Sequence, residues 1–194
     1  MNGERLTLER KLVVTGIGGQ GIIFVTKVLA QAAMARGERV MASENHGMSQ
    51  RGGSVMSYVK IGGSEAPLIR RGTADTLVAL DRVEAIRALP YLRLSGQVCV
   101  NSPDGLGSEF MPRLNEMGVQ VHAFDADACA KELGASPVAN LVLLGFAAAR
   151  GALGLTIDEL QTAVQTLGPA KAVGLNLKAL EMGARRALAI HETL

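Results

Sequence analysis

The sequence predicts an α/β fold, a three-layer, mostly parallel and possibly mixed Rossmann-like sheet with helices on both faces. Apolar segments of strand length alternate with longer segments whose apolar residues follow a helical period. A glycine-rich loop, residues 16–21, joins the first strand pattern to the first helix pattern. The hydrophobic content of 48% and the 23 glycines fit a compact chain and exclude a disordered one. At 194 residues, we expect one domain that spans residues 1–194.

The first third of the chain contains three strand patterns and one helix pattern. Residues 12–15 are apolar and β-branched, as in a strand that is covered on both faces, and residues 20–36 carry one apolar helical stripe. Further strands are expected at 39–42 and, from a period of two, at 54–61. The link at residues 43–53 has no helix pattern. Because parallel neighbours need a longer crossover, this link indicates a long functional loop or an antiparallel strand pair.

The rest of the chain alternates between strands and helices and then becomes helical. Asp81 is a suitable N-cap, with Glu84 three residues later. The apolar stretch 138–155 is interrupted by Asn140 and Arg150 and is shorter than the roughly 20 residues that span a bilayer, so it predicts a buried helix. The strands are expected at 76–80, 96–101 and 119–124, and the helices at 81–89, 110–117, 127–133, 138–152 and 173–191, with another helix starting at the capping box Thr156 to Glu159.

Composition and charge exclude several classes of function. The net charge of +2 comes from 20 basic and 18 acidic residues, and only 3% of residues are aromatic, so no nucleic-acid-binding surface is indicated. Cys99 and Cys129 stand alone, which excludes an iron–sulfur or zinc site built from this chain only and indicates buried reduced thiols. Residues 1–12 lack the hydrophobic core of a signal peptide, so we expect a cytoplasmic protein without a membrane segment.

The first glycine loop has two interpretations. Gly16, Gly18, Gly19, Gln20 and Gly21 follow a strand pattern and precede a helix pattern. Bare backbone N–H groups and the positive end of a helix dipole at such a position suit a phosphate. The same glycines equally serve a tight turn that lets strand and helix pack closely. Residues 16–21 alone leave both interpretations open.

The second glycine-rich loop, residues 43–53, carries the polar candidates. Glu44 stands near the position of the acidic residue that holds ribose hydroxyls in dinucleotide-binding folds. This keeps a stand-alone NAD- or FAD-binding oxidoreductase as an alternative, although Glu44 could also cap the loop or pair with Arg51. Arg51, beside Gly52 and Gly53, suits a carboxylate or a phosphate, or else a structural ion pair.

His46 lies in the same loop and could act as a general acid or base, or donate a hydrogen bond to an anion. No Ser-His-Asp order, carboxylate pair or metal-spaced cluster accompanies it. We therefore assign no catalytic residue and no metal ligand from the sequence.

Taken together, the two loops resemble the gamma-type subunit of 2-oxoacid:ferredoxin oxidoreductases. A third segment, Gly72-Thr73-Ala74-Asp75, precedes a buried strand. With this segment included, the chain is most similar to the smaller, beta subunit of indolepyruvate:ferredoxin oxidoreductases. The resemblance rests on Gly16-Ile17-Gly18-Gly19-Gln20-Gly21, on Glu44-Asn45-His46-Gly47-Met48-Ser49-Gln50-Arg51-Gly52-Gly53-Ser54-Val55, and on Gly72-Thr73-Ala74-Asp75.

The resemblance implies a subunit of a complex that decarboxylates an aryl 2-oxoacid, forms acyl-coenzyme A and reduces ferredoxin. Pyruvate, branched-chain and 2-oxoglutarate versions remain open. Thiamine diphosphate, magnesium and iron–sulfur clusters would belong to a large partner subunit, so this chain would bind none of them and would be inactive alone. A non-enzymatic nucleotide- or coenzyme A-binding module is a further alternative. The residues expected to bind a cofactor or to face the partner's active site are Gly16, Gly18, Gly19, Gln20, Gly21, Glu44, His46, Gln50, Arg51, Gly52 and Gly53.

Overall fold

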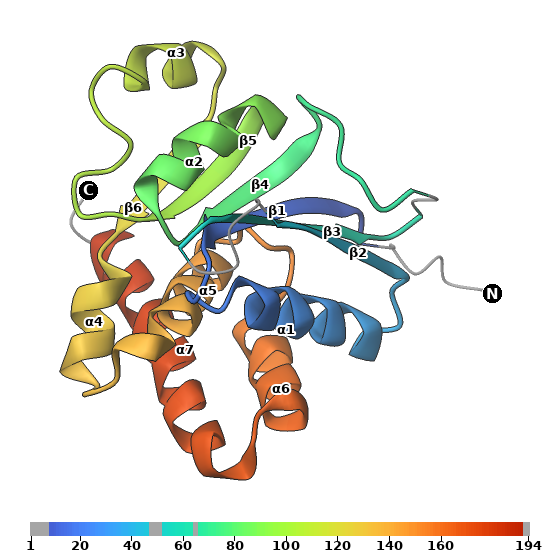
Figure 1. The fold of residues 1–194 in the computed structure, drawn as a ribbon, viewed down its shortest axis with the longest axis vertical. Coiled ribbons are helices and arrows are strands. Elements are labelled where there is room, and N and C mark those ends of the chain that lie inside the picture. The colour runs from blue at the N-terminus through green and yellow to red at the C-terminus, as the bar shows by residue number, and fades with distance from the viewer. Residues whose placement is uncertain (1–7, 47–51, 64–65, 192–194) are drawn as a thin grey trace.

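A six-stranded sheet forms the middle layer of the protein, in strand order β2-β3-β1-β4-β5-β6 (Figure 1). The structure is a computed structural model that describes residues 8–46, 52–63 and 66–191. The strands are β1 (Arg10–Ile17), β2 (Val40–His46), β3 (Ser54–Ile61), β4 (Ala74–Ala79), β5 (Leu92–Asn101) and β6 (Gln120–Phe124).

One strand makes this sheet mixed. β3 is antiparallel to both of its neighbours, β1 and β2, whereas β1 with β4, β4 with β5, and β5 with β6 are parallel pairs. The predicted mostly parallel, possibly mixed sheet is confirmed, and of the two interpretations of residues 43–53 the antiparallel strand pair is correct. The expected end of the second strand at residue 42 is wrong, because β2 continues to His46.

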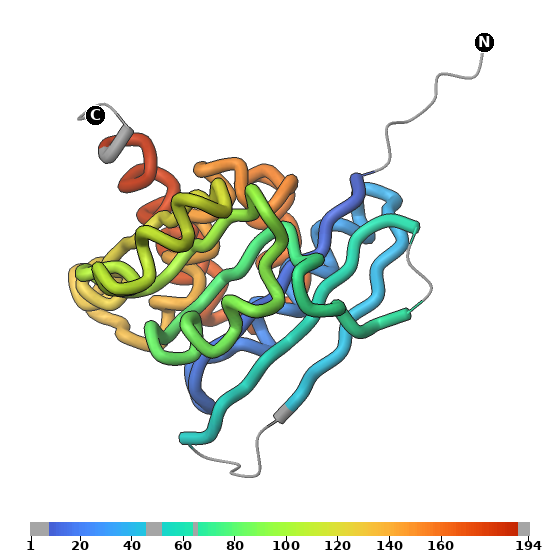
Figure 2. Tube along the Cα trace, turned by 90° about the horizontal axis from the view of Figure 1, so that it is seen from above, coloured from blue at the N-terminus to red at the C-terminus, as the bar shows by residue number. Residues whose placement is uncertain are grey.

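Helices cover both faces of the sheet (Figures 1 and 2). One hydrophobic cluster joins one face to α1, α4, α5, α6 and α7, and a second cluster joins the opposite face to α2 and α3. The predicted three layers are therefore present, with most helices on one side. The helices are α1 (Ile22–Ala35), α2 (Arg82–Ala88), α3 (Met111–Glu116), α4 (Ala126–Glu132), α5 (Ala139–Ala149), α6 (Ile157–Leu167) and α7 (Ala170–His191), with short 3-10 turns at Leu89–Tyr91 and Ser136–Val138.

Strand β1 shows why its sequence is continuously apolar. Leu12 and Val14 belong to the cluster on the α1 face, whereas Val13 belongs to the cluster on the α2 face. All three side chains are fully buried, because successive residues of a strand point to opposite faces and both faces carry helices.

Helices α5 and α7 cross so closely that their backbones touch at two glycines. A Cβ on Gly145 would overlap the carbonyl oxygen of Leu180, and a Cβ on Gly183 would overlap that of Val142. Every residue of α5 from Ala139 to Ala148 is buried, so this helix is the predicted buried helix. Among the described residues, no helix is long and apolar enough to cross a membrane.

The predicted helix starts agree with the structure where a cap defines them. The Asp81 side chain accepts a hydrogen bond from Glu84 N at the start of α2, and Thr156 and Glu159 form the predicted capping box of α6. The expected start of the last helix at residue 173 is wrong, because α7 begins at Ala170.

Candidate functional site

The candidate site lies where the parallel strands end. A cavity of about 250 Å³ opens at the carboxyl ends of β1, β4 and β5, between the glycine loop after β1 and the segment that enters α5. The chain leaves β1 toward β2 and β3 on one side of the sheet, while β4 lies on the other side, so the cavity occupies the switch point at which open α/β sheets bind ligands. The lining residues are Gly19, Gln20, Leu80, Asn101, Asp127, Ser136, Pro137, Ala139 and Asn140.

Gln20 holds the glycine loop in place with its side chain. Its Oε1 accepts a hydrogen bond from Ile17 N at 2.7 Å, and its Nε2 donates to Leu80 O at 3.2 Å. Gly16 leaves the space for this arrangement, because a Cβ there would come within 2.5 Å of Gln20 Oε1 and 3.1 Å of Leu80 Cβ. Gln20 therefore bridges the loop after β1 to the end of β4.

The loop turns into helix α1 at Gly21. Its φ of 79° is left-handed, a conformation that favours glycine, and no side chain caps the helix there. A Cβ at this position would overlap Nδ2 of Asn140, which donates a hydrogen bond to Gly21 O at 3.5 Å. Asn140 thus packs against the loop from the first turn of α5.

Several backbone N–H groups of this loop are bound to its own chain. Gly18 N donates to Gly53 O at 2.9 Å and Gln20 N donates to Ile17 O at 3.1 Å, in addition to the bond from Ile17 N to Gln20. A phosphate cradle needs such N–H groups to be available for the ligand. The N–H groups of Ile17, Gly18 and Gln20 therefore serve the tight turn, and phosphate binding by the rest of the loop stays a prediction.

The bond between Gly18 and Gly53 also joins the two predicted loops at one end of the sheet. Gly52, with a φ of 75°, precedes this contact and is exposed. His46 ends β2, but its side chain lies outside the described part of the chain, as do Gln50 and Arg51. The structure thus brings the first loop together with Gly53, and the roles of His46, Gln50 and Arg51 stay predictions.

Glu44 lies on β2 rather than in a loop. It pairs with Ser57 of β3, and β3 lies between β2 and β1. Two strand spacings, roughly 9–10 Å, therefore separate the β2 backbone from β1. In dinucleotide-binding folds the acidic residue acts from the strand next to β1. Glu44 does not line the cavity, so this topology does not favour the stand-alone dinucleotide-binding alternative.

Four polar residues of the cavity were not candidates from the sequence: Asn101, Asp127, Ser136 and Asn140. Asn101 ends β5, where its Nδ2 donates to Asp127 Oδ2 at 3.0 Å and its Oδ1 accepts from Ala126 N at 2.9 Å. Asn140 was visible only as a polar interruption of an apolar helix pattern. Polar residues that interrupt an apolar helix pattern or end a buried strand were the sequence signals that could have indicated these cavity residues.

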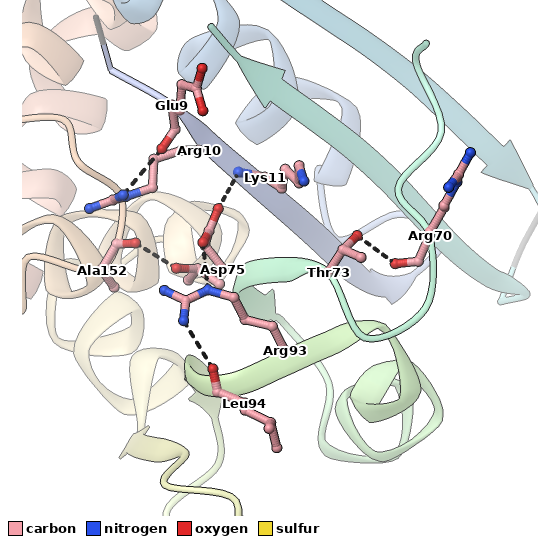
Figure 3. A network of polar contacts seen from close by, with 10 residues as sticks. Glu9, Arg10, Lys11, Arg70, Thr73, Asp75, Arg93, Leu94 and Ala152 are labelled. Carbon is pink, nitrogen blue, oxygen red and sulfur yellow. Dashed lines mark hydrogen bonds and ion pairs between the residues drawn. The ribbon is translucent and has the colours of Figure 1, made fainter. Parts of the chain in front are cut away.

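The opposite end of the sheet is more strongly charged (Figure 3). A cavity of about 360 Å³ there is lined by residues that include Arg10, Lys11 and Lys60. Asp75 accepts hydrogen bonds from Lys11 N at 2.8 Å and from Arg93 Nε at 2.7 Å. Burial and the neighbouring charges of Lys11 and Arg70 lower the pKa of Lys60. None of the predicted site residues lines this end, so we place the candidate site at the carboxyl end.

Both cysteines are buried, as predicted, and neither forms a disulfide bond. Burial raises the pKa of the Cys99 thiol to about 12 and also raises that of Cys129. Two buried thiols, one on β5 and the other on α4, do not fit the four thiolates of a cubane cluster. Across the described residues, no group of three or more His, Cys, Asp or Glu side chains is placed to hold a metal ion.

His122 shares no element with the candidate site. Arg150 Nε donates to its Nδ1 at 3.3 Å, and burial together with the Arg150 charge lowers the pKa of His122 to about 4. The imidazole is therefore neutral at physiological pH and serves as an acceptor between β6 and the end of α5.

The sequence of residues 11–186 matches the family model described as pyruvate ferredoxin/flavodoxin oxidoreductase. The chain belongs to this family. Indolepyruvate oxidoreductase subunit IorB from Thermococcus kodakarensis is 33% identical, over 92% of this chain and 96% of the relative. Subunit IorB from Archaeoglobus fulgidus is 35% identical, over 93% of this chain and 96% of the relative.

A solved structure of the same family has the same fold. The gamma subunit of a keto/oxoacid ferredoxin oxidoreductase from Geobacter sulfurreducens superposes with a TM-score of 0.73 at 30% identity, over 93% of this chain and 99% of that chain. The predicted resemblance to gamma-type subunits is thereby confirmed. These relatives match along nearly their whole lengths, so the family assignment does not depend on the glycine motif alone.

Proposed function

We propose that this chain is the small subunit of a 2-oxoacid:ferredoxin oxidoreductase that acts on an aryl 2-oxoacid. The observation that supports this most strongly is the match over nearly the full length to two IorB subunits of indolepyruvate oxidoreductases. In this proposal the complex converts the 2-oxoacid to an acyl-coenzyme A and passes the electrons to ferredoxin. The complex works in the cytoplasm, where reduced thiols such as Cys99 and Cys129 persist.

A larger partner subunit supplies the reactive cofactors in this proposal. Thiamine diphosphate would provide the carbanion chemistry and iron–sulfur clusters the electron path. This chain does not fit either group, because it has only two cysteines and its cavity of about 250 Å³ lies below the range of about 300–1,000 Å³ that is typical for whole small-molecule ligands. The chain therefore contributes surface and positioning rather than the bond-breaking steps.

The two glycine loops are the part of the chain that we place against the partner's active site or the coenzyme A path. They meet at one end of the sheet through the hydrogen bond from Gly18 N to Gly53 O. A single contact surface there would include both the first loop and residues 43–53. In this proposal Arg51 would supply a cation to that surface, and its guanidinium would bind a carboxylate or a phosphate.

Reconstitution tests the proposed function. The chain would be produced alone and together with the larger oxidoreductase subunit of its source, and reduction of a viologen dye would be followed with aryl 2-oxoacid and coenzyme A. We expect the pair to co-purify and the activity to require both chains. Turnover by this chain alone, or failure of the chains to associate when both are folded, would contradict the proposal.

The substitution Arg51→Ala tests the role of the second loop. We expect the complex to assemble normally but to lose most of its turnover, because a cation beside the active site would be missing. Arg113→Ala is a matched control, since Arg113 lies on α3 with a side chain that is 74% exposed. Equal turnover of the Arg51→Ala and Arg113→Ala complexes would reduce the loop to a structural role.

A further inference from the structure

The cavity at the carboxyl end of the sheet has a chemistry that differs from that of a nucleotide phosphate site. The described residues that line it include no lysine, arginine or histidine. They supply the carboxamides of Gln20, Asn101 and Asn140, the hydroxyl of Ser136 and the carboxylate of Asp127. The charge that this wall presents to a ligand is therefore negative.

Asp127 is held in place by a buried neighbour. Asn101 is 9% exposed, and its carboxamide binds Ala126 N through Oδ1 and Asp127 Oδ2 through Nδ2. A carboxylate has about four lone-pair positions, so this one bond leaves Asp127 able to accept further N–H or O–H donors. The residue is an oriented acceptor at the edge of the cavity.

On the other side of the cavity, Asn140 and Gln20 pack against the glycine loop. Asn140 is 7% exposed and is fixed on both sides, because its Oδ1 accepts from Leu141 N at 2.7 Å and its Nδ2 donates to Gly21 O. Gln20 is bound to Ile17 N and Leu80 O. The polar groups of Gln20 and Asn140 are thus bound to the chain itself, and neither side chain brings a positive charge to the cavity.

The apolar lining residues and the volume of the cavity limit further which ligands would fit. Leu80, Pro137 and Ala139 add an apolar part to the lining. The volume of about 250 Å³ lies just below the range of about 300–1,000 Å³ that is typical for whole small-molecule ligands. The cavity therefore accommodates one sugar or heterocyclic group rather than a complete dinucleotide.

We propose that this cavity binds an uncharged sugar or nucleobase group that donates N–H or O–H hydrogen bonds to Asp127 and packs against Leu80 and Pro137. A phosphate is disfavoured, because it would meet the Asp127 carboxylate without a compensating cation in the lining. This inference concerns the cavity of this chain alone and does not depend on the proposed subunit function.

Amide chemical shifts of the isotopically labelled full-length chain test the proposal. Adenine, ribose and adenosine would be titrated separately, to distinguish a base from a sugar, with inorganic pyrophosphate as the anionic probe. We expect at least one neutral probe to shift the amides of Gly19, Asn101 and Asn140 at millimolar concentration, and pyrophosphate to leave them unchanged. Tighter binding of pyrophosphate, or no shift with any neutral probe, would overturn the proposal.

The variant Asp127→Asn tests the acceptor. It keeps the shape and an oxygen for Asn101 but removes the charge, so the neutral probe that binds the wild type should bind about tenfold more weakly. Asp158→Asn, at an exposed position on α6, is the matched control and should bind like the wild type. Unchanged binding by a folded Asp127→Asn variant would overturn the proposal. If the variant does not fold, the chemical shifts of the wild type with the neutral probes and pyrophosphate test the proposal. Neither result would alter the co-purification that tests the subunit assignment.

Discussion

Glycines allow close contact in two regions of this protein, the loop after β1 and the crossing of α5 with α7, and the contacts differ in kind. In the loop, the atoms that a Cβ at Gly16 or Gly21 would meet first are the side-chain ends of Gln20 and Asn140. At the crossing, a Cβ at Gly145 or Gly183 would meet backbone carbonyl oxygens. A side-chain end can rotate away at modest cost, whereas the backbone of a buried helix cannot.

Because of this difference, we expect the loop after β1 to accommodate a larger residue more easily than the crossing of α5 with α7. The loop and its two amides form a wall whose shape depends on rotamers. The crossing fixes the distance between α5 and α7, and through α5 the position of Asn140. Four predictions test this contrast, in order of decreasing expected effect.

The largest effect is expected at the crossing. Gly183→Ala would place a methyl group against Val142 O, with Phe146 N also within 2.8 Å, and should lower the free energy of unfolding by about 3 kcal/mol or more. Gly145→Ala should behave similarly because it meets Leu180 O. Urea denaturation followed by circular dichroism measures both changes. Losses below about 1 kcal/mol would show that the helices separate easily and would remove the contrast.

A smaller loss is expected at the loop. Gly21→Ala introduces a left-handed alanine and displaces Asn140, which should cost about 2 kcal/mol. In an Asn140→Ala background the steric part disappears, so the loss should shrink to the backbone part of about 1 kcal/mol. A double-mutant cycle on unfolding free energies measures this coupling. Equal losses in both backgrounds would mean that Asn140 does not obstruct this position.

The hydrogen bonds of Gln20 come next. Gln20→Ala removes the partners of Ile17 N and Leu80 O and should lower the free energy of unfolding by about 1–2 kcal/mol. Gln161→Ala is a suitable control, because that glutamine is on α6 and binds Glu181 at an exposed site, and its loss should stay below about 0.5 kcal/mol. A similar result for the two variants would indicate that the Gln20 bonds contribute little.

The smallest effect has the opposite sign. Gly174 lies in α7, where a Cβ would meet no atom within 4 Å. Gly174→Ala should therefore raise the free energy of unfolding by about 0.5–1 kcal/mol, the difference in helix propensity between the two residues. The measurement is the same urea titration used for Gly183→Ala on the same helix. Destabilisation here would show that α7 is sensitive along its whole length and not only at the crossing.

Local patterns in the sequence predicted most elements of the fold. The apolar run at the first strand, the N-cap Asp81 and the capping box at Thr156 all lie in the structure as expected. The errors fall where local preference is weak. Ser43, Glu44 and Asn45 extend an edge strand that shows no apolar alternation, and the missed start of α7, residues 170–172, lies before the first residue of its apolar stripe, Val173.

The candidate site was predicted only in part, because its walls come from distant segments. The glycine loop was recognisable as a strand-to-helix turn, but its hydrogen-bond partners Leu80 and Asn140 lie 60 and 119 residues away from Gln20 and Gly21. The insertion of β3 between β1 and β2 was also beyond local patterns, and it is this insertion that moved Glu44 away from the loop. Long-range pairing is set by the packing of the whole sheet, which no single segment encodes.

The reversed direction of β3 determines where the connection between β2 and β3 lies. A parallel successor to β2 would require the chain to return to the amino end of the sheet through a helix, whereas an antiparallel successor turns back at once. The end of β2 and the start of β3 therefore lie at the same end of the sheet as the glycine loop, and the hydrogen bond from Gly18 N to Gly53 O joins this loop to the residue before β3. Changes in the length or sequence of the segment between β2 and β3 would alter the surface beside the glycine loop without disturbing a helix, so this surface could change while the three layers stay the same.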